Sequence, residues 1–208
     1  MTLIEKFAAT TASLEDLSDS AARLNDALRV TDAPAEVLGA VEEKLHEALD
    51  LLRGFERKGP HSQSLLNDSQ ADFFARETSV PHELMPYSPL IGRRNPVSPR
   101  FELQVVENRV EGRGRFPVRY AGAPQTAHGG LVAALLDEIM GMVNFVNGEG
   151  AFTGTLTVRY HGPTPIDRDL TAVAEIVRVE GRKILSRAEI RCDGALTASA
   201  EGLFIKPR

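Results

Sequence analysis

Residues 129–143, Gly-Gly-Leu-Val-Ala-Ala-Leu-Leu-Asp-Glu-Ile-Met-Gly-Met-Val, decide how the rest of the chain is interpreted. The segment is apolar on nearly every side, and a helix of that kind is buried, either in a core or against a second copy of itself. We expect a helix over 129–146 with two carboxylates, Asp137 and Glu138, in its middle. An unpaired buried carboxylate is costly or has a raised pKa. We expect Glu138 to reach solvent and Asp137 to be functional, because aspartate is also a poor helix former in mid-helix.

Short runs with strand character lie on both sides of this helix. Two precede it, and four follow it. They cover residues 101–107, 109–116, 152–161, 170–179, 183–191 and 196–205. Glu180-Gly181 and Asp193-Gly194 are typical of two-residue hairpin turns, so the last three strands should form an antiparallel meander. The order of elements predicts an α+β fold with the sheet wrapped around the helix.

Strand 152–161 alternates between polar and apolar residues. Since successive side chains of a strand point to opposite faces, each set should occupy one face. We expect the polar face to carry Thr153, Thr155, Thr157 and Arg159. We expect the face toward the core to carry Phe152, Leu156, Val158 and Tyr160.

The first half of the chain has a different organisation. Apolar residues recur at helical spacing over 1–53, Ser13 with Asp16 is a plausible N-cap arrangement, and a second helix should begin near Asp32 and end near Gly54. Prolines then accumulate without periodicity. We therefore divide the chain into a helical hairpin extension (1–56), a proline-rich connector (57–100) and a main domain (101–208).

Composition excludes several classes of function. The net charge of −5 arises within residues 1–100, while 101–208 is neutral, so a nucleic-acid partner is not expected. One cysteine, Cys192, and the lack of a signal peptide or of an apolar run of about 20 residues predict a cytoplasmic protein without a membrane span. The five histidines show no metal-ligand spacing, and no Gly-x-Ser-x-Gly motif occurs. We expect no metal.

The tetrapeptide Ala127-His128-Gly129-Gly130 precedes the central helix. Glycines at a helix start let a ligand approach free backbone N–H groups, which stabilise developing negative charge as in an oxyanion hole. Gly129 and Asp137 are eight residues apart, which is roughly 12 Å along one helix. Both can act on one carbonyl only if Asp137 comes from an antiparallel second copy, so the pattern predicts a homodimer with two equivalent interface sites.

Three features together resemble the PaaI-type hotdog-fold acyl-CoA thioesterases, and in particular the thioesterase superfamily member 4 group. The features are His128-Gly129-Gly130 with Asp137 nine residues after the histidine, the stretch 153–160, and the Val179–Lys183 hairpin with the closing residues 203–206. The resemblance covers about residues 85–208. It departs at the loop before His128, where some members have an asparagine and this chain offers Gln125 as the only nearby amide.

The resemblance implies hydrolysis of an acyl-CoA, without a cofactor, to a free acid and CoA by a homodimer or tetramer. Asp137 would activate water or act as the nucleophile, and the Gly129 N–H would polarise the thioester carbonyl. His128 would shape the pocket, and Thr153 would assist the attacking water. The substrate-binding residues that it implies are Gly130, Arg159, His161, Arg182 and Lys183.

Two alternatives from other classes stay open. A hotdog hydratase or dehydratase would act on the same kind of thioester but would require a catalytic histidine opposite an acid. A non-catalytic acyl-CoA binding protein would use the helical extension as its partner module, and its function would survive Asp137→Asn.

Overall fold

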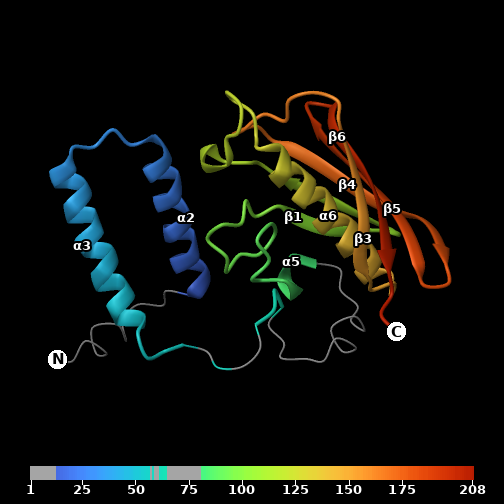
Figure 1. Cartoon of the computed structure of the whole chain (residues 1–208), viewed down its shortest axis with the longest axis horizontal. Helices are drawn as coiled ribbons and strands as arrows, with labels where there is room; N and C mark the ends of the chain where they lie inside the picture. Colours follow the sequence, from blue (N-terminus) through green and yellow to red (C-terminus); the bar gives the residue numbers. More distant parts are fainter. Residues whose placement is uncertain (1–12, 57, 59–60, 65–80) are drawn as a thin grey trace.

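The computed structural model describes residues 13–56, 58, 61–64 and 81–208. Within them a six-stranded antiparallel sheet curves around one long helix, and a pair of helices stands beside it (Figure 1). The predicted α+β class and the sheet wrapped around the helix are confirmed. Parts of the predicted helical extension (1–12) and of the predicted connector (57, 59–60 and 65–80) lie outside the described residues.

The sheet has the order β1-β2-β4-β5-β6-β3, and every neighbouring pair is antiparallel. Its strands are β1 (Glu102–Val106), β2 (Arg109–Gly114), β3 (Phe152–Tyr160), β4 (Leu170–Glu180), β5 (Lys183–Cys192) and β6 (Ala195–Ile205). Strands β4, β5 and β6 form the predicted meander. The turn after β5 is Asp193-Gly194, as predicted, and both of its residues have positive φ. The turn after β4 is Gly181-Arg182, one residue later than predicted, because Glu180 still pairs with Lys183.

Helix α6 (Gly129–Val146) has the predicted bounds and fills the concave side of the sheet. Among the described residues it is the one helix long and apolar enough to cross a membrane by length and composition. Half of it is buried within the fold, and its apolar character is explained by that position in the core. The α6 side chains with no exposed surface are Leu135, Leu136, Ile139, Met140, Val143 and Asn144.

Strand β3 lies at one edge of the sheet, so one of its sides has no strand partner among the described residues. A register shift between Thr153 and Thr155 marks a β-bulge at Gly154. The bulge pairs Thr153 with the buried Phe204 and turns its side chain toward α6. The prediction that Thr153 shares the outer polar face with Thr155, Thr157 and Arg159 is therefore wrong. Strict alternation fails where one strand contains an extra residue.

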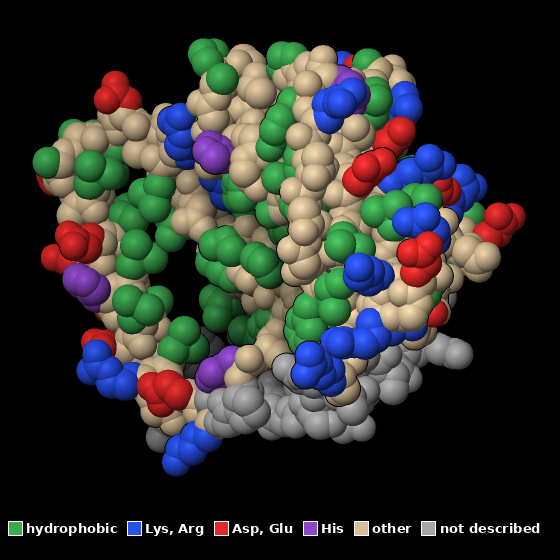
Figure 2. Space-filling model, turned by 45° about the vertical axis from the view of Figure 1, so that its right-hand side comes forward, with side chains coloured by type: hydrophobic (Ala, Val, Ile, Leu, Met, Phe, Trp, Pro, Cys, Tyr) green, Lys and Arg blue, Asp and Glu red, His purple; other side chains and the backbone are tan. Residues whose placement is uncertain are grey.

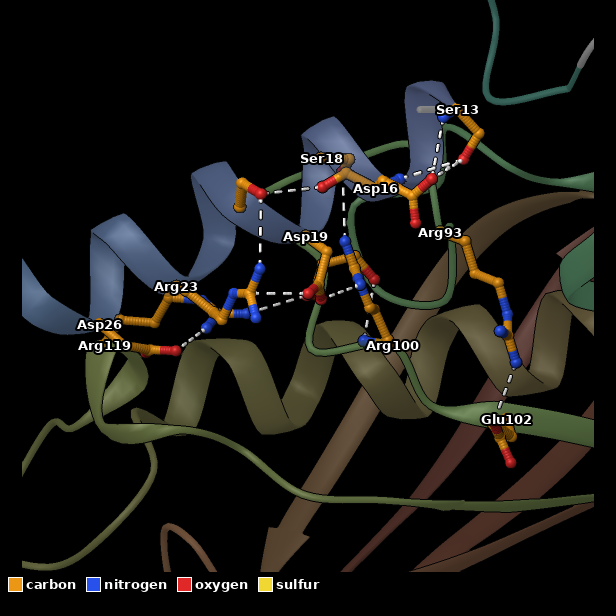
Figure 3. Close-up of polar contacts among 12 residues, drawn as sticks. Ser13, Asp16, Ser18, Asp19, Arg23, Asp26, Arg93, Arg100, Glu102 and Arg119 are labelled. Carbon is orange, nitrogen blue, oxygen red and sulfur yellow. Dashed lines mark hydrogen bonds and ion pairs between the residues drawn. The ribbon is translucent and has the colours of Figure 1, made fainter. Parts of the chain in front are cut away.

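Helices α2 (Leu14–Val30) and α3 (Ala35–Leu52) precede this body. Ser13 and Asp16 form a capping box at the start of α2, in agreement with the predicted N-cap. Figure 3 shows α2 joined to the body by ion pairs: Asp26 binds Arg119 at 2.5 Å, and Asp19 binds Arg100 at 2.5 Å. Arg119 belongs to the short helix η1 (Val118–Tyr120), which precedes α6. Polar contacts thus hold α2 in place.

Helix α3 contains no buried residue. Figure 2 shows hydrophobic side chains exposed along the left-hand part of the view, where the helical pair lies. The exposed large hydrophobic residues of α3 are Val37, Leu38, Leu45, Leu49, Leu51 and Leu52.

Candidate active site

Asp137 lies in the middle of α6, partly buried, with its carboxylate turned toward β3. Thr153 donates a hydrogen bond of 2.8 Å from its Oγ1 to Asp137 Oδ1. The bulge at Gly154 makes this contact possible, because it brings Thr153 to the helix side of the sheet. Sequence reasoning named both residues, and the structure brings them together.

A cavity of about 300 Å³ opens beside Asp137. Its polar lining is Gln63, Asp137, Glu138 and Thr153. Its apolar lining is Met142, Phe145, Ala151, Phe152 and Phe204, with Gly141 between them. A carboxylate at the wall of a largely apolar cavity suits a polar reacting group that is attached to an apolar substituent.

Glu138, which was expected to reach solvent, is partly buried. Its side chain turns inward, and Ser88 Oγ donates a hydrogen bond of 2.6 Å to its Oε1. Burial raises the pKa of Glu138, the charge of Asp137 raises it further, and the hydrogen bond from Ser88 acts in the opposite direction. Ser88 lies 50 positions earlier in the chain, so helical periodicity gave no signal of this partner.

The start of α6 carries the second group of predicted residues. His128 is the N-cap, and its Nδ1 accepts a hydrogen bond of 3.1 Å from the Gly130 N–H. The neighbouring Gly129 N–H has no acceptor within the part of the chain that the structure describes. Tyr160 donates a hydrogen bond of 2.8 Å from its hydroxyl to the Gly129 carbonyl. Tyr160 was predicted only as a residue facing the core, and it proves to be a neighbour of the helix start.

Arg159 and His161 lie on the outer face of the sheet, opposite to the face that carries Asp137. They line a second cavity of about 350 Å³ together with Arg187 of β5 and Ser199 of β6. The His161 Nε2 and Ser199 Oγ atoms are 2.8 Å apart. Within the described chain these two basic residues do not line the cavity beside Asp137.

Arg182 and Lys183 lie at the turn between β4 and β5. The Arg182 guanidinium donates two hydrogen bonds, of 3.0 and 2.7 Å, to the Lys206 carbonyl. Lys183 pairs with Ile205, which in turn pairs with Phe152. The turn is therefore at the same end of the sheet as Thr153 and Asp137.

The predicted residues thus form two groups at opposite ends of β3. One contains Asp137 and Thr153, with Arg182 and Lys183 two strands away. The other lies at the Tyr160 end: His128, Gly129 and Gly130 are on the helix side of the sheet, and Arg159 and His161 are on its outer face. Eight helical residues, or roughly 12 Å, separate Gly129 from Asp137. A single described chain does not join the two groups.

The described residues were also considered as possible metal ligands. Among the described residues, no three His, Cys, Asp or Glu side chains are gathered so that they could hold a metal ion.

A solved structure of a thioesterase superfamily protein matches this fold over nearly its whole length. The two chains are 30% identical, the match covers 94% of this chain and 96% of the other, and the TM-score is 0.80. This chain belongs to the thioesterase superfamily. The sequence profile of the thioesterase superfamily also matches residues 124–198, which run from the loop before His128 into β6. The resemblance to hotdog-fold thioesterases that the His-Gly-Gly and Asp137 spacing indicated is confirmed.

Two curated relatives match a shorter segment. The chain is 32% identical over 87 residues to the human acyl-coenzyme A thioesterase THEM5, and 33% identical over 87 residues to THEM4 of Xenopus laevis. Each match covers 41% of this chain, but only 35% and 39% of the respective relative. The chain therefore spans little more than a third of the length of these thioesterases.

Proposed function

We propose that this protein hydrolyses acyl-CoA thioesters to a free acid and CoA, at two equivalent sites in a homodimer. The observation that carries the proposal is Asp137: a carboxylate on an apolar helix, hydrogen-bonded to Thr153, at the wall of a largely apolar cavity. Family membership and the names of the curated relatives support the same reaction class.

The edge position of β3 supports the homodimer. An unpaired edge strand can pair with the same strand of a second copy, and a two-fold axis makes that pairing antiparallel. Phe152 and Tyr160, at the two ends of β3, are 48% and 53% exposed in the protomer, which leaves apolar surface for a partner to cover. An axis near the middle of β3, at Leu156 or Thr157, sets the Thr153 end of one strand beside the Tyr160 end of the other.

That pairing would unite the two groups of residues. Asp137 and Thr153 of one protomer would lie beside the partner's Gly129 and Tyr160, because Tyr160 is hydrogen-bonded to Gly129 and Thr153 to Asp137. Gly129 and Asp137, which are roughly 12 Å apart along one helix, would thus meet between the helices of two subunits. Each dimer would contain two such sites.

The chemistry follows from this arrangement. The Gly129 N–H would donate to the thioester oxygen and stabilise its negative charge as the carbonyl carbon becomes tetrahedral. Asp137 would either accept a proton from the attacking water or attack the carbon itself to give an anhydride that water then hydrolyses. In either route the carbon–sulfur bond breaks and CoA leaves as a thiolate. A thiol of pKa about 8.5 needs little help from a general acid.

Basic residues from both groups would hold the CoA portion. Arg182 and Lys183 are at the Asp137 end of the sheet, and the partner's Arg159 and His161 would reach the same end through the two-fold pairing. Guanidinium and ammonium groups bind phosphate well.

The test is a panel of acyl-CoA substrates of graded chain length, with hydrolysis followed by release of the free thiol. We expect turnover of at least one acyl-CoA and a loss of at least about 100-fold in kcat for Asp137→Asn, as for removal of a base or nucleophile. Full activity of Asp137→Asn, or an active enzyme that light scattering finds monomeric at the assay concentration, would refute the proposal. Hydration of crotonyl-CoA without thiol release would instead indicate a hydratase.

A further inference from the structure

Ser88 is completely buried, and its hydrogen bonds are fully determined by its neighbours. Its Oγ accepts hydrogen bonds of 3.2 Å from both the Leu90 and the Ile91 N–H groups. A serine hydroxyl has two acceptor sites and one proton, so the proton is left for Glu138 Oε1, at 2.6 Å. Glu138 Oε1 is therefore an obligatory acceptor of this bond.

The segment around Ser88 is a rigid support. The Ser88 N–H donates to the Met85 carbonyl at 3.0 Å, and the Gly92 N–H donates to the Ser88 carbonyl at 3.1 Å. Gly92 packs so closely that a Cβ there would lie 2.5 Å from the Pro86 carbonyl oxygen, which leaves room only for glycine. The side chains of Met85 and Ile91 are buried in the core at 1% exposure. Ser88 thus presents its hydroxyl from a fixed position.

Glu138 and Asp137 are adjacent in the helix and line the same cavity. Two ionised carboxylates in one partly buried site repel each other, so one tends to keep its proton. Burial raises the pKa of Glu138, and the charge of Asp137 raises it further, while the hydrogen bond from Ser88 lowers it.

We infer that Glu138 is a positioning residue for the thioesterase reaction. Anchored by Ser88, it fixes the central turn of α6 against the buried segment 85–92, so that the Asp137 carboxylate faces Thr153 and the cavity. This inference rests on the proposed function, because it assigns Glu138 a role at the same site. The inference adds that Ser88, 50 positions before Glu138 and ahead of the sheet, holds the Asp137 carboxylate in place through Glu138.

The experiment compares four variants by kcat, KM and the pH dependence of kcat/KM for acyl-CoA hydrolysis. Ser88→Ala and Glu138→Ala break the anchor, and we expect kcat to fall by about 10-fold or more with KM changed by less than about 3-fold, since a small misplacement of a reacting group is costly. Glu138→Gln keeps an oxygen that accepts from Ser88 and stays neutral, so we expect kcat within about 3-fold of wild type.

Ser98→Ala is the matched control. Ser98 is also completely buried in the segment before β1, but its Oγ accepts a hydrogen bond of 2.9 Å from the Arg100 N–H of its own segment. We expect this variant to keep kcat even where its melting temperature falls as far as that of Ser88→Ala. This comparison separates positioning from a general loss of stability.

The pH profile supplies a test that needs only Glu138→Gln to fold. If Glu138 acts by its position and not by a charge, the acid limb of kcat/KM should coincide in wild type and Glu138→Gln, to within about half a unit. An acid limb lowered by a unit or more would show that Glu138 carries charge and would overturn the inference.

Two further outcomes would also overturn it. One is wild-type kcat in both Ser88→Ala and Glu138→Ala, and the other is a Glu138→Gln variant as impaired as Glu138→Ala. If either result is found and Asp137→Asn is inactive, only the role of Glu138 is rejected and the proposed function stands. An active Asp137→Asn rejects the proposed function itself.

Discussion

The hydrogen bond from Thr153 to Asp137 gives a quantitative prediction for Thr153→Val. The substitution keeps the shape of the side chain but removes the hydroxyl that donates to Asp137 Oδ1 at 2.8 Å. A hydrogen bond to a charged group contributes about 1.5–3 kcal/mol. Thr153 is exposed, so we reduce this to about 1–2 kcal/mol for solvent competition. At about 1.4 kcal/mol per factor of ten, kcat/KM should fall by roughly 5- to 30-fold.

Thr155→Val is the control for this measurement. Thr155 lies on the other side of the bulge, its side chain points to the outer face, and it is also exposed. Both variants should be assayed by thiol release with one acyl-CoA at several concentrations. The reasoning would be refuted if Thr153→Val stayed within twofold of wild type, or if Thr155→Val lost as much activity. Thr153→Ser, which retains the hydroxyl, should keep most of the activity.

Three other predictions concern stability. Arg119→Met leaves Asp26 unpaired where α2 contacts η1, so we expect the free energy of unfolding to fall by about 2 kcal/mol and proteolysis within α2 to become faster. An unchanged cleavage rate would show that this ion pair does not hold α2 in place. Gly92→Ala forces a Cβ to within 2.5 Å of the Pro86 oxygen and should lower the melting temperature by several degrees, while Gly39→Ala, with nothing within 4 Å, should not. Because the pKa of Glu138 is raised in the folded protein, its contribution to stability is present below the usual carboxyl pKa and is lost as pH rises through the folded value. The melting temperature of Glu138→Gln relative to wild type should therefore rise from pH 4 to pH 8, and a constant difference would contradict the assignment.

The sequence predicted the central helix well, because its signals are local. Gly129 and Gly130 mark its start, and the run of apolar residues through Val146 marks a buried helix. The meander was predicted from Asp193-Gly194 and from the glycine after Glu180, with an error of one residue at the first turn. Alternation of polar and apolar residues and the residue types of tight turns are local patterns, so they can be recognised in a single sequence.

The errors came from relations that no short stretch contains. The bulge at Gly154 changes the face of Thr153, yet a lone glycine in a strand does not say whether an extra residue is present. The hydrogen bond between Ser88 and Glu138 was missed, because Ser88 is far away in sequence and belongs to a segment without periodicity. The position of Tyr160 beside Gly129 depends on how β3 crosses the start of α6.

Complementation between two inactive variants tests the proposed site at the dimer interface most directly. Gly129→Pro removes the N–H at the first position of α6, where proline is well tolerated, and Asp137→Asn removes the carboxylate. Each homodimer should be inactive. After the two variants are mixed through unfolding and refolding at equal amounts, half of the dimers should be mixed, and each mixed dimer should have one intact site. We predict recovery of about a quarter of wild-type activity. If the mixture stayed as inactive as its parents while mass spectrometry detected the mixed dimer, Gly129 and Asp137 would not act across two subunits.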